Sequence, residues 1–204
     1  MQRGKGLDLH VSVKRPTGFS LTELLVALAV AMVLMAIGLP MFLRAYHAYQ
    51  LSNAATQVAD ILRLTRYEAI RLNKSVACII QPSGAYPGMT NLWADSNGNG
   101  TLDPLEKVIL LGNSGNLVDS GTVPGAAALL TSAVGSMIPT APSPGGSVIW
   151  FDARGAVNPP TNVNVFYLAS SAAPEAGYRA VLLLPAGSIQ IWTSDTTGNW
   201  QQQR

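Results

Sequence analysis

The sequence has little of the chemistry that most catalytic and metal sites need. Its 204 residues include one cysteine, Cys78, and two histidines, His10 and His47. A single cysteine cannot form an intrachain disulfide, and these three side chains fall short of a four-ligand zinc site. The sequence contains no G-x-S-x-G turn and no glycine-rich phosphate loop. A Ser–His–acid triad would have to use His47, beside a long apolar run. The sequence therefore predicts a protein that is not an enzyme.

Charged residues are also few, at 12% of the chain, and they are unevenly distributed. Residues 1–18 carry four Lys or Arg against one Asp, whereas residues 44–204 carry nine Lys or Arg and nine Asp or Glu. Nucleic-acid binding needs several cations that neutralise phosphates. The one basic group has acidic residues at i,i+3 and i,i+4 spacing, which is typical of a solvated helix face. It consists of Arg63, Arg66, Arg71 and Lys74, with Asp60 and Glu68. A nucleic-acid partner is not expected.

A long uncharged run follows the basic start. Leu24–Leu43 is twenty residues without a charge, and a helix needs roughly 20 residues to cross a bilayer. The run is longer than the roughly 7–15 apolar residues of a removed signal peptide, and no small-residue cleavage site closes it before Arg44. The sequence predicts a retained membrane span with its basic end in the cytoplasm.

Glu23 stands directly before this run. A carboxylate at the edge of a membrane span is costly to desolvate and is a functional candidate. Two structural roles compete with that interpretation. Ser20-Leu21-Thr22-Glu23 fits the S-x-x-E capping box of a helix start. A Glu in the first helical turn also interacts favourably with the helix dipole, which stabilises the helix by about 0.3–1 kcal/mol. These residues alone leave both possibilities open.

Beyond the span, residues 44–73 contain no Gly or Pro and repeat apolar or small residues at helical spacing. The repeat consists of Leu51, Ala54, Ala55, Val58, Ile61, Leu62, Ala69 and Leu72. We expect one helix from Phe19 to Asn73, about 80 Å long at 1.5 Å per residue. Residues 19–43 would form its transmembrane or assembly part, and residues 44–73 an amphipathic continuation. Gly38 and Pro40 should kink or locally open it.

After Asn73 the pattern changes to short apolar runs separated by turn residues, which predicts strands. The runs are Val76–Ile80, Asn91–Trp93, Val108–Leu111, Val148–Phe151, Val163–Leu168, Ala180–Leu184 and Ser188–Trp192. The last two form a hairpin that turns at Pro185-Ala186-Gly187. Cys78 is expected to be a small buried strand residue. Residues 112–146, nearly uncharged, should form a long, partly ordered loop with a short helix at Ala126–Val134. The fold class is thus α+β, with a β-rich domain over residues 74–204.

The start of the chain resembles the class III signal of type IV pilins and type II secretion pseudopilins. A basic leader precedes Gly18-Phe19-Ser20-Leu21-Thr22-Glu23, and twenty apolar residues follow. The resemblance implies that prepilin peptidase removes residues 1–18 and methylates the new amine of Phe19. Glu23 is then the fifth residue, and it would pair with the Phe19 amine of a neighbouring subunit during assembly, because an unpaired buried charge costs several kcal/mol. Pro40 stands where that family often has a helix-breaking proline.

The remainder resembles the GspH/FimT subfamily of minor pilins and pseudopilins. Its features occur in order as ADILRLTRYEAIRLNKSVAC, LWADSNGNGTLDPLEKVIL, VIWFDARGAV and LLLPAGSIQIW. The resemblance implies a pilin-like fold, in which the long helix packs on an antiparallel sheet domain. It also implies a single-pass inner-membrane subunit with a periplasmic C-terminal domain, which later joins other pilins or pseudopilins in a filament. DNA-binding FimT-like members carry a Gly-Arg-x-Arg stretch. This chain has Gly187-Ser188-Ile189-Gln190 there, which argues against DNA binding.

Residues 95–106 fit the calcium-loop pattern D-x-[DN]-x-[DN]-G-x5-E. The oxygen ligands would come from Asp95, Asn97, Asn99, Thr101, Asp103 and Glu106. The alternative is a long Asn/Gly hairpin in which these side chains make local hydrogen bonds. The flanking NLW and KVILL look like strands, whereas an EF-hand needs helices, and this favours the hairpin. Calcium is therefore a possible cofactor, and no other is expected.

Two choices of function stay open. An ordinary membrane-anchored binding protein would keep its leader or lose it to a conventional signal peptidase, and it would tolerate replacement of Glu23. Among filament subunits, a type IV pilus minor pilin that contributes to priming and a type II secretion pseudopilin share every feature above. The long, unusual Gly/Ala/Pro-rich segment 112–146 favours the pilus, because it suggests an exposed, variable surface.

Overall fold

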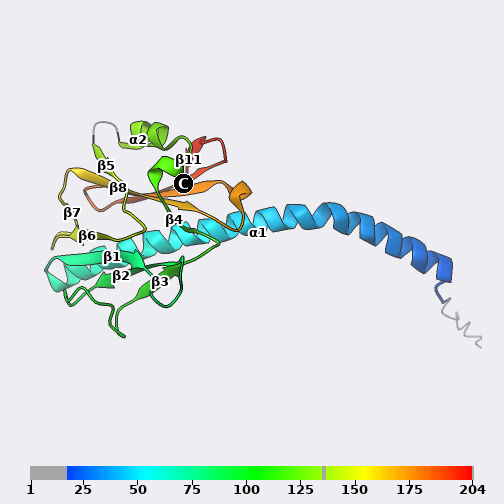
Figure 1. The fold of residues 1–204 in the computed structure, drawn as a ribbon, viewed down its shortest axis with the longest axis horizontal. Coiled ribbons are helices and arrows are strands. Elements are labelled where there is room, and N and C mark those ends of the chain that lie inside the picture. The colour runs from blue at the N-terminus through cyan, green and yellow to red at the C-terminus, as the bar shows by residue number, and fades with distance from the viewer. Residues whose placement is uncertain (1–17, 135–136, 204) are drawn as a thin grey trace, which may run out of the picture. The chain divides into compact units, whose positions relative to one another are not determined.

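A computed structural model of the chain describes residues 18–134 and 137–203. The predicted leader, residues 1–18, therefore lies outside the described residues except for Gly18. The chain divides into two compact units, Met1–Pro40 and Met41–Arg204, and each is treated by itself below. Elements are labelled in Figure 1.

The helix α1 runs from Leu21 to Leu72, close to the predicted Phe19–Asn73. It begins where the Glu23 amide donates to Ser20 Oγ at 3.2 Å. It ends at Asn73, whose φ of 49° is the left-handed conformation common just after a helix. Helical structure continues through Gly38 and Pro40. The helix is therefore not interrupted at Pro40, although a proline removes one backbone hydrogen bond, and the kink predicted as the alternative stays a prediction.

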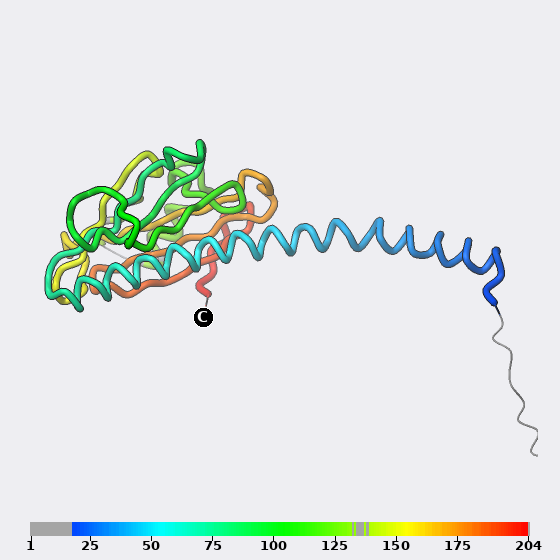
Figure 2. Tube along the Cα trace, turned by 90° about the horizontal axis from the view of Figure 1, so that it is seen from below, coloured from blue at the N-terminus to red at the C-terminus, as the bar shows by residue number. Residues whose placement is uncertain are grey.

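The second unit contains two β-sheets and a short helix in addition to residues 41–72 of α1 (Figure 2). The first sheet has the strand order β3-β2-β1-β6-β7 and is antiparallel throughout. Its strands are β1 (Val76–Pro82), β2 (Thr90–Asp95), β3 (Val108–Leu111), β6 (Ser147–Phe151) and β7 (Val157–Asn158).

The second sheet has the order β11-β10-β9-β8-β4, and β5 pairs with β8 in the parallel direction. Its strands are β4 (Asn116–Val118), β5 (Ile138–Thr140), β8 (Asn162–Ala169), β9 (Tyr178–Leu183), β10 (Ile189–Ser194) and β11 (Trp200–Gln202). The helix α2 (Ala126–Val134) and two single 3₁₀ turns, Ser120–Thr122 and Pro174–Ala176, complete the unit. The predicted antiparallel sheet domain is confirmed; it contains two sheets, and the β5–β8 pair is parallel.

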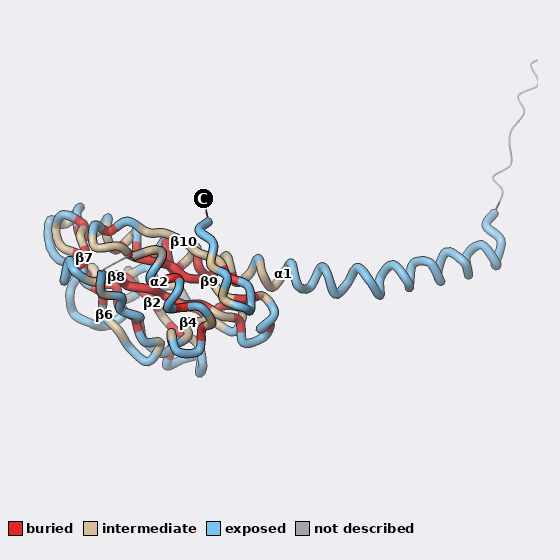
Figure 3. The backbone as a smooth tube through the Cα atoms, turned by 90° about the horizontal axis from the view of Figure 1, so that it is seen from above, coloured by how far each residue is buried: buried red, intermediate tan, exposed pale blue. Residues whose placement is uncertain are grey.

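The main core lies where α1 meets the inner faces of both sheets. The predicted apolar repeat of α1 is buried there from Leu51 to Ala69. Alternate residues of the first sheet face it, among them Cys78 and Phe151, and so do Phe166 and Val181 of the second sheet. Burial along the chain is drawn in Figure 3. The helix therefore serves as the central element of this unit's core.

A second core lies between α2 and the face of the second sheet that points away from α1. It contains Leu129 of α2, with Val165, Tyr167 and Leu182 of β8 and β9. Side chains alternate between the two faces of a strand, so neighbouring residues of β8 and β9 serve the two cores in turn. This sheet is consequently covered on both faces, by α1 on one and by α2 on the other.

All seven predicted strands are present, and α2 has the predicted bounds. The hairpin turn is also as predicted, with the Gly187 amide donating to the Leu184 carbonyl at 2.8 Å. The description of residues 112–146 as a long loop was incomplete, because the segment also contains β4 and β5. These strands have three residues each and show no periodicity of their own; pairing with β8, distant in sequence, makes them strands.

Arg66 departs from the predicted solvated basic face. It is half-buried, and its Nη1 donates to the Gly187 carbonyl at 3.2 Å, while its Nε is buried without a partner. The other predicted pairs are confirmed on the surface, where Arg63 pairs with Asp60 and Arg71 pairs with Glu68. Arg66 therefore anchors the β9–β10 turn to α1. Cys78 is buried in β1 as predicted, and burial raises the pKa of its thiol to about 12.

Candidate assembly site and membrane span

The predicted processing site lies on exposed backbone before α1. Gly18 and Phe19 precede the helix, and 80% of Phe19 is accessible. Nothing within 4 Å would crowd a side chain at Gly18. The bond between Gly18 and Phe19 is therefore open to a protease in this conformation. Cleavage of this bond stays a prediction.

Glu23 lies in the first turn of α1 and is exposed. Ser20 makes one half of the capping box, since its Oγ accepts from the Glu23 amide at 3.2 Å and contacts Thr22 Oγ1 at 3.1 Å. The reciprocal half is not formed within the described residues, where the Glu23 carboxylate accepts no hydrogen bond. The capping role thus falls to Ser20, and the charge of Glu23 stays available for another partner.

The uncharged run after Glu23 is helical and exposed along its whole length, from Leu24 to Leu43. Within the described residues, α1 is the one helix long and apolar enough to cross a membrane. Exposed apolar side chains cost about 25 cal/mol for each Å² left in water. A lipid or protein surface is the environment in which this stretch is stable.

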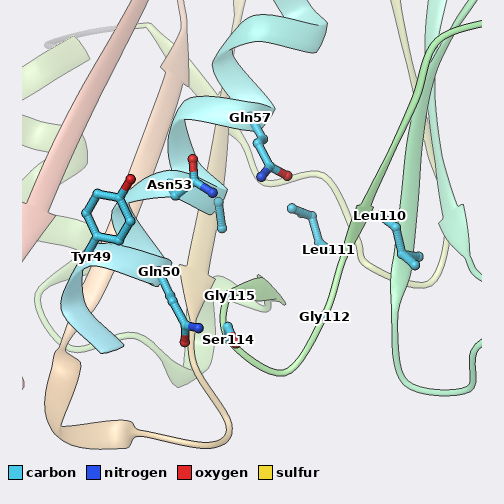
Figure 4. A pocket seen from close by; sticks show the side chains of 10 residues that line it. Tyr49, Gln50, Asn53, Gln57, Leu110, Leu111, Gly112, Ser114 and Gly115 are labelled. Carbon is cyan, nitrogen blue, oxygen red and sulfur yellow. The ribbon is translucent and has the colours of Figure 1, made fainter. Parts of the chain in front are cut away.

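A pocket lies on the other part of α1, where the helix faces the connection from β3 to β4 (Figure 4). Its polar lining is uncharged and includes Gln50, Asn53 and Gln57 of α1. Gly115 closes it, because a Cβ there would lie 2.6 Å from the Ala54 Cβ. No local sequence pattern indicates this pocket, since its two sides are about sixty residues apart along the chain.

The predicted calcium loop is closed by its own hydrogen bonds. The Asp95 carboxylate accepts from the amides of Gly98 and Gly100, at 2.7 and 2.9 Å. The Glu106 carboxylate accepts from the amides of Ser96 and Asp103. These bonds are those of the alternative hairpin interpretation.

The two asparagine side chains of the loop direct their nitrogens toward the Asp103 carboxylate. Asn97 and Asn99 both donate through Nδ2 to Asp103 Oδ2, the latter at 2.7 Å. Among the described residues, no group of three or more His, Cys, Asp or Glu side chains is placed to hold a metal. The contacts favour a hydrogen-bonded turn, and calcium binding stays a prediction.

Comparison with protein families gives two matches that overlap these regions. The family described as "Type II transport protein GspH" matches residues 54–187, and the "Prokaryotic N-terminal methylation motif" matches residues 14–39. The first match covers most of the chain. This chain belongs to the GspH family.

For a GspH family member, the methylation-motif match includes Gly18, Phe19 and Glu23. The family match includes most of the buried part of α1, the β3–β4 side of the pocket, the Asp95–Glu106 loop and the hairpin turn. The chain is accordingly a minor pilin or pseudopilin, a structural subunit of a type IV pilus or a type II secretion system. Its anchoring helix and its globular unit are the two parts that such a subunit needs.

Solved structures similar to this GspH family member include the type IV minor pilin FimU of Pseudomonas aeruginosa in two crystal forms. One has 17% identity and a TM-score of 0.47, and covers 76% of this chain and 94% of FimU. The other has 19% identity and a TM-score of 0.43, and covers 76% and 98%. No curated protein matches the sequence.

Proposed function

We propose that this chain is a non-catalytic minor pilin of a type IV pilus, cleaved after Gly18 and methylated on the Phe19 amine. The main support is the start of α1. There an accessible Gly18–Phe19 bond and an unpaired Glu23 carboxylate precede twenty exposed uncharged residues. The family's methylation motif supports this processing. Prepilin peptidase is the enzyme that acts on such a signal.

Glu23 would act in assembly. Cleavage after Gly18 creates a cationic amine on Phe19, four residues before the Glu23 carboxylate. When apolar helices pack together, both charges lose water, and a partner offsets a cost of several kcal/mol for each. The Glu23 carboxylate of one subunit and the Phe19 amine of its neighbour can supply that pairing. The pair would also set the axial register of the incoming subunit.

Before assembly, the chain would lie in the inner membrane with its C-terminal unit in the periplasm. The four cations of the leader favour a cytoplasmic N-terminus. The uncharged run from Leu24 to Leu43 has the length of one bilayer crossing. Withdrawal of this helix into a filament would then exchange lipid contacts for protein contacts.

A type II secretion pseudopilin is the second candidate, and the matched family description favours it. The reason for preferring the pilus is the surface formed by residues 137–146, which carries no charge and is mostly exposed. This exposed surface is shorter than the predicted loop of residues 112–146, because α2 and β4 of the same segment pack into the two cores. Deletion of the gene distinguishes a role in the type IV pilus from a role in type II secretion. Loss of surface pili with normal protein secretion supports the pilus, and the opposite result supports the pseudopilin.

The intact mass and N-terminal sequence of the chain recovered from membranes test the processing. The expected product begins at methylated Phe19. A product that begins at Met1, or after the apolar run, would contradict the proposal and leave Glu23 without an assembly partner.

Glu23→Ala tests the assembly role, with Thr22→Ala as the matched control one residue away. We expect Glu23→Ala to be cleaved and inserted normally but to be lost from sheared filaments. Glu23→Gln should be similarly impaired, because it keeps the shape and removes the charge. Normal incorporation of both Glu23 variants would refute the charge pairing without affecting the processing result.

A further inference from the structure

Three aromatic side chains form an exposed stripe directly after the uncharged run. Phe42, Tyr46 and Tyr49 are 65%, 48% and 70% accessible. Their spacing of four and three residues places them on one face of α1. Phe42 and Tyr46 stack, with ring centroids 6.4 Å apart. Since exposed rings cost free energy in water, this face is expected to have an apolar or amphipathic neighbour.

The position of the stripe matches the thickness of a membrane interface. Phe42 and Leu43 end the uncharged run, and Arg44 is the first charge after it. At 1.5 Å per residue, Tyr46 and Tyr49 lie about 6 and 10 Å beyond Phe42 along the helix. A bilayer has about 30 Å of hydrocarbon and 40–45 Å in total, which leaves roughly 5–8 Å of headgroups on each side. Phe42 and Tyr46 fit this layer, and the backbone of Tyr49 lies about 2–5 Å beyond it, with its Cβ tilted back toward the helix N-terminus and the membrane.

We infer that Phe42, Tyr46 and Tyr49 form an interfacial anchor that contacts lipid headgroups and sets the depth of the globular unit before assembly. Amphipathic aromatic rings are enriched at this level of membranes, because the ring is apolar and the hydroxyl can stay hydrated. The Arg44 guanidinium lies at the same level and can reach headgroup phosphates. The inference rests on the proposed membrane-anchored stage.

Lipid is the expected neighbour of the aromatic stripe, because the stripe is continuous with the candidate membrane span. The stripe begins where the exposed run Leu24–Leu43 ends, and that run is the candidate membrane span. Farther along the same face of α1, Asn53 and Gln57 are amides that line the pocket of Figure 4. The face therefore changes from apolar through aromatic to polar within about four turns, as expected for a helix that leaves a bilayer.

The first test measures depth with nitroxide labels on the full chain in vesicles of phosphatidylcholine and phosphatidylglycerol. Tyr46→Cys and Tyr49→Cys carry the labels, and Cys78 can stay because it is buried and its thiol pKa is raised to about 12. Tyr67→Cys is the matched control. Tyr67 is 61% accessible on the same face of α1, five turns beyond Tyr49 and about 27 Å along the axis.

The readout is collision of each label with oxygen and with a water-soluble nickel chelate. We expect labels at Tyr46 and Tyr49 to lose nickel collisions relative to Tyr67, with Tyr46 the more protected. A label on Val33→Cys should be protected most. If Tyr46 and Tyr49 are as accessible as Tyr67 while Val33 is protected, the aromatic anchor is refuted and the span stands. If Val33 is also accessible, the membrane-anchored stage itself fails.

The second test asks whether the aromatic rings set the depth. A label on Asn53→Cys, one turn beyond Tyr49, is measured with and without Tyr46→Ser and Tyr49→Ser together. We expect the paired change to shift the nickel accessibility at Asn53, and Tyr46→Trp with Tyr49→Trp to restore it. Tyr67→Ser should leave it unchanged. No shift in the paired variant, with native circular dichroism, would show that the face serves another partner, such as a neighbouring subunit.

Discussion

Gly115, in the connection from β3 to β4, lies close against α1. A Cβ at this position would lie 2.6 Å from the Ala54 Cβ and 3.3 Å from Leu51 Cδ1. Both neighbours are buried on α1, so neither can turn outward into solvent. The reason for glycine here is close packing, which a local sequence pattern does not reveal.

Gly115→Ala should therefore destabilise the fold by about 1–3 kcal/mol, the usual cost of overpacking. Gly121→Ala is the matched control, because nothing lies within 4 Å of a Cβ there. Urea unfolding of the full chain in detergent measures both. Equal midpoints for the two variants would contradict the packing role of Gly115.

Arg179 is a buried cation that joins β9 to α1. Its Nε donates to Ser52 Oγ at 3.1 Å, and its other nitrogens donate to backbone carbonyls of α1 and of its own sheet, including Tyr178 at 2.9 Å. Burial lowers its pKa, and among the described residues no carboxylate pairs with it. Its contribution is a set of donors that satisfy buried acceptors.

Arg179→Ala should cost about 2–4 kcal/mol of unfolding free energy, since it removes hydrogen bonds to several part-buried acceptors and the packed stem of the side chain. Arg63→Ala, which breaks an exposed pair with Asp60, should cost at most about 1 kcal/mol. The comparison is made by denaturant unfolding. A smaller loss for Arg179→Ala than for Arg63→Ala would show that the buried network is not stabilising.

The Asp95–Glu106 loop shows how a sequence pattern for metal binding can serve a turn instead. The Asp95 and Glu106 carboxylates are occupied by backbone amides, and the Asp103 carboxylate by two asparagine side chains. Gly98 and Gly100 supply the positive φ values that the turn requires. Calcium would need the same oxygens to turn toward a common centre. The backbone amides and a calcium ion would thus compete for the same side-chain oxygens.

Addition of calcium or of a chelator should leave the melting temperature of the full chain unchanged if the hydrogen-bonded turn is correct. Asp95→Ala should lower it in either condition, because two amides lose their acceptor. A rise in melting temperature with calcium that disappears in Asp95→Ala would instead establish the predicted metal site.

Alkaline pH should destabilise the whole globular unit. Burial raises the pKa of the Cys78 thiol from 9.0 and of the Tyr167 phenol from 10.0, each to about 12. Both groups are held neutral by the fold and ionise more readily when unfolded. Their contribution is complete below pH 9 and declines as the pH rises toward 12.

Tyr167→Phe should flatten the fall in stability between pH 10 and pH 12, because it removes one of these groups. It also removes a long hydrogen bond to the Ala126 carbonyl, at 3.5 Å, so a small uniform loss is expected. Tyr67→Phe on the exposed surface is the control for loss of a phenol. An unchanged slope in Tyr167→Phe would contradict the role of its ionisation.

Local patterns were sufficient for much of the architecture. The helix bounds, the seven strands, α2 and the hairpin turn follow from apolar period and turn residues, which are properties of neighbouring positions. The strands β4, β5, β7 and β11 were missed because they have two or three residues and depend on partners elsewhere. The division into two sheets has the same cause.

The sequence by itself determined the candidate membrane span, the motif around Gly18, Phe19 and Glu23, and hence the family, because each depends on contiguous residues. The tertiary structure alone decided which polar groups are buried. It placed Arg66 under the hairpin turn and turned the Asp95 carboxylate toward its own loop. It also left the stripe from Phe42 to Tyr49 exposed. Burial depends on what packs from distant parts of the chain, and no local pattern carries that information.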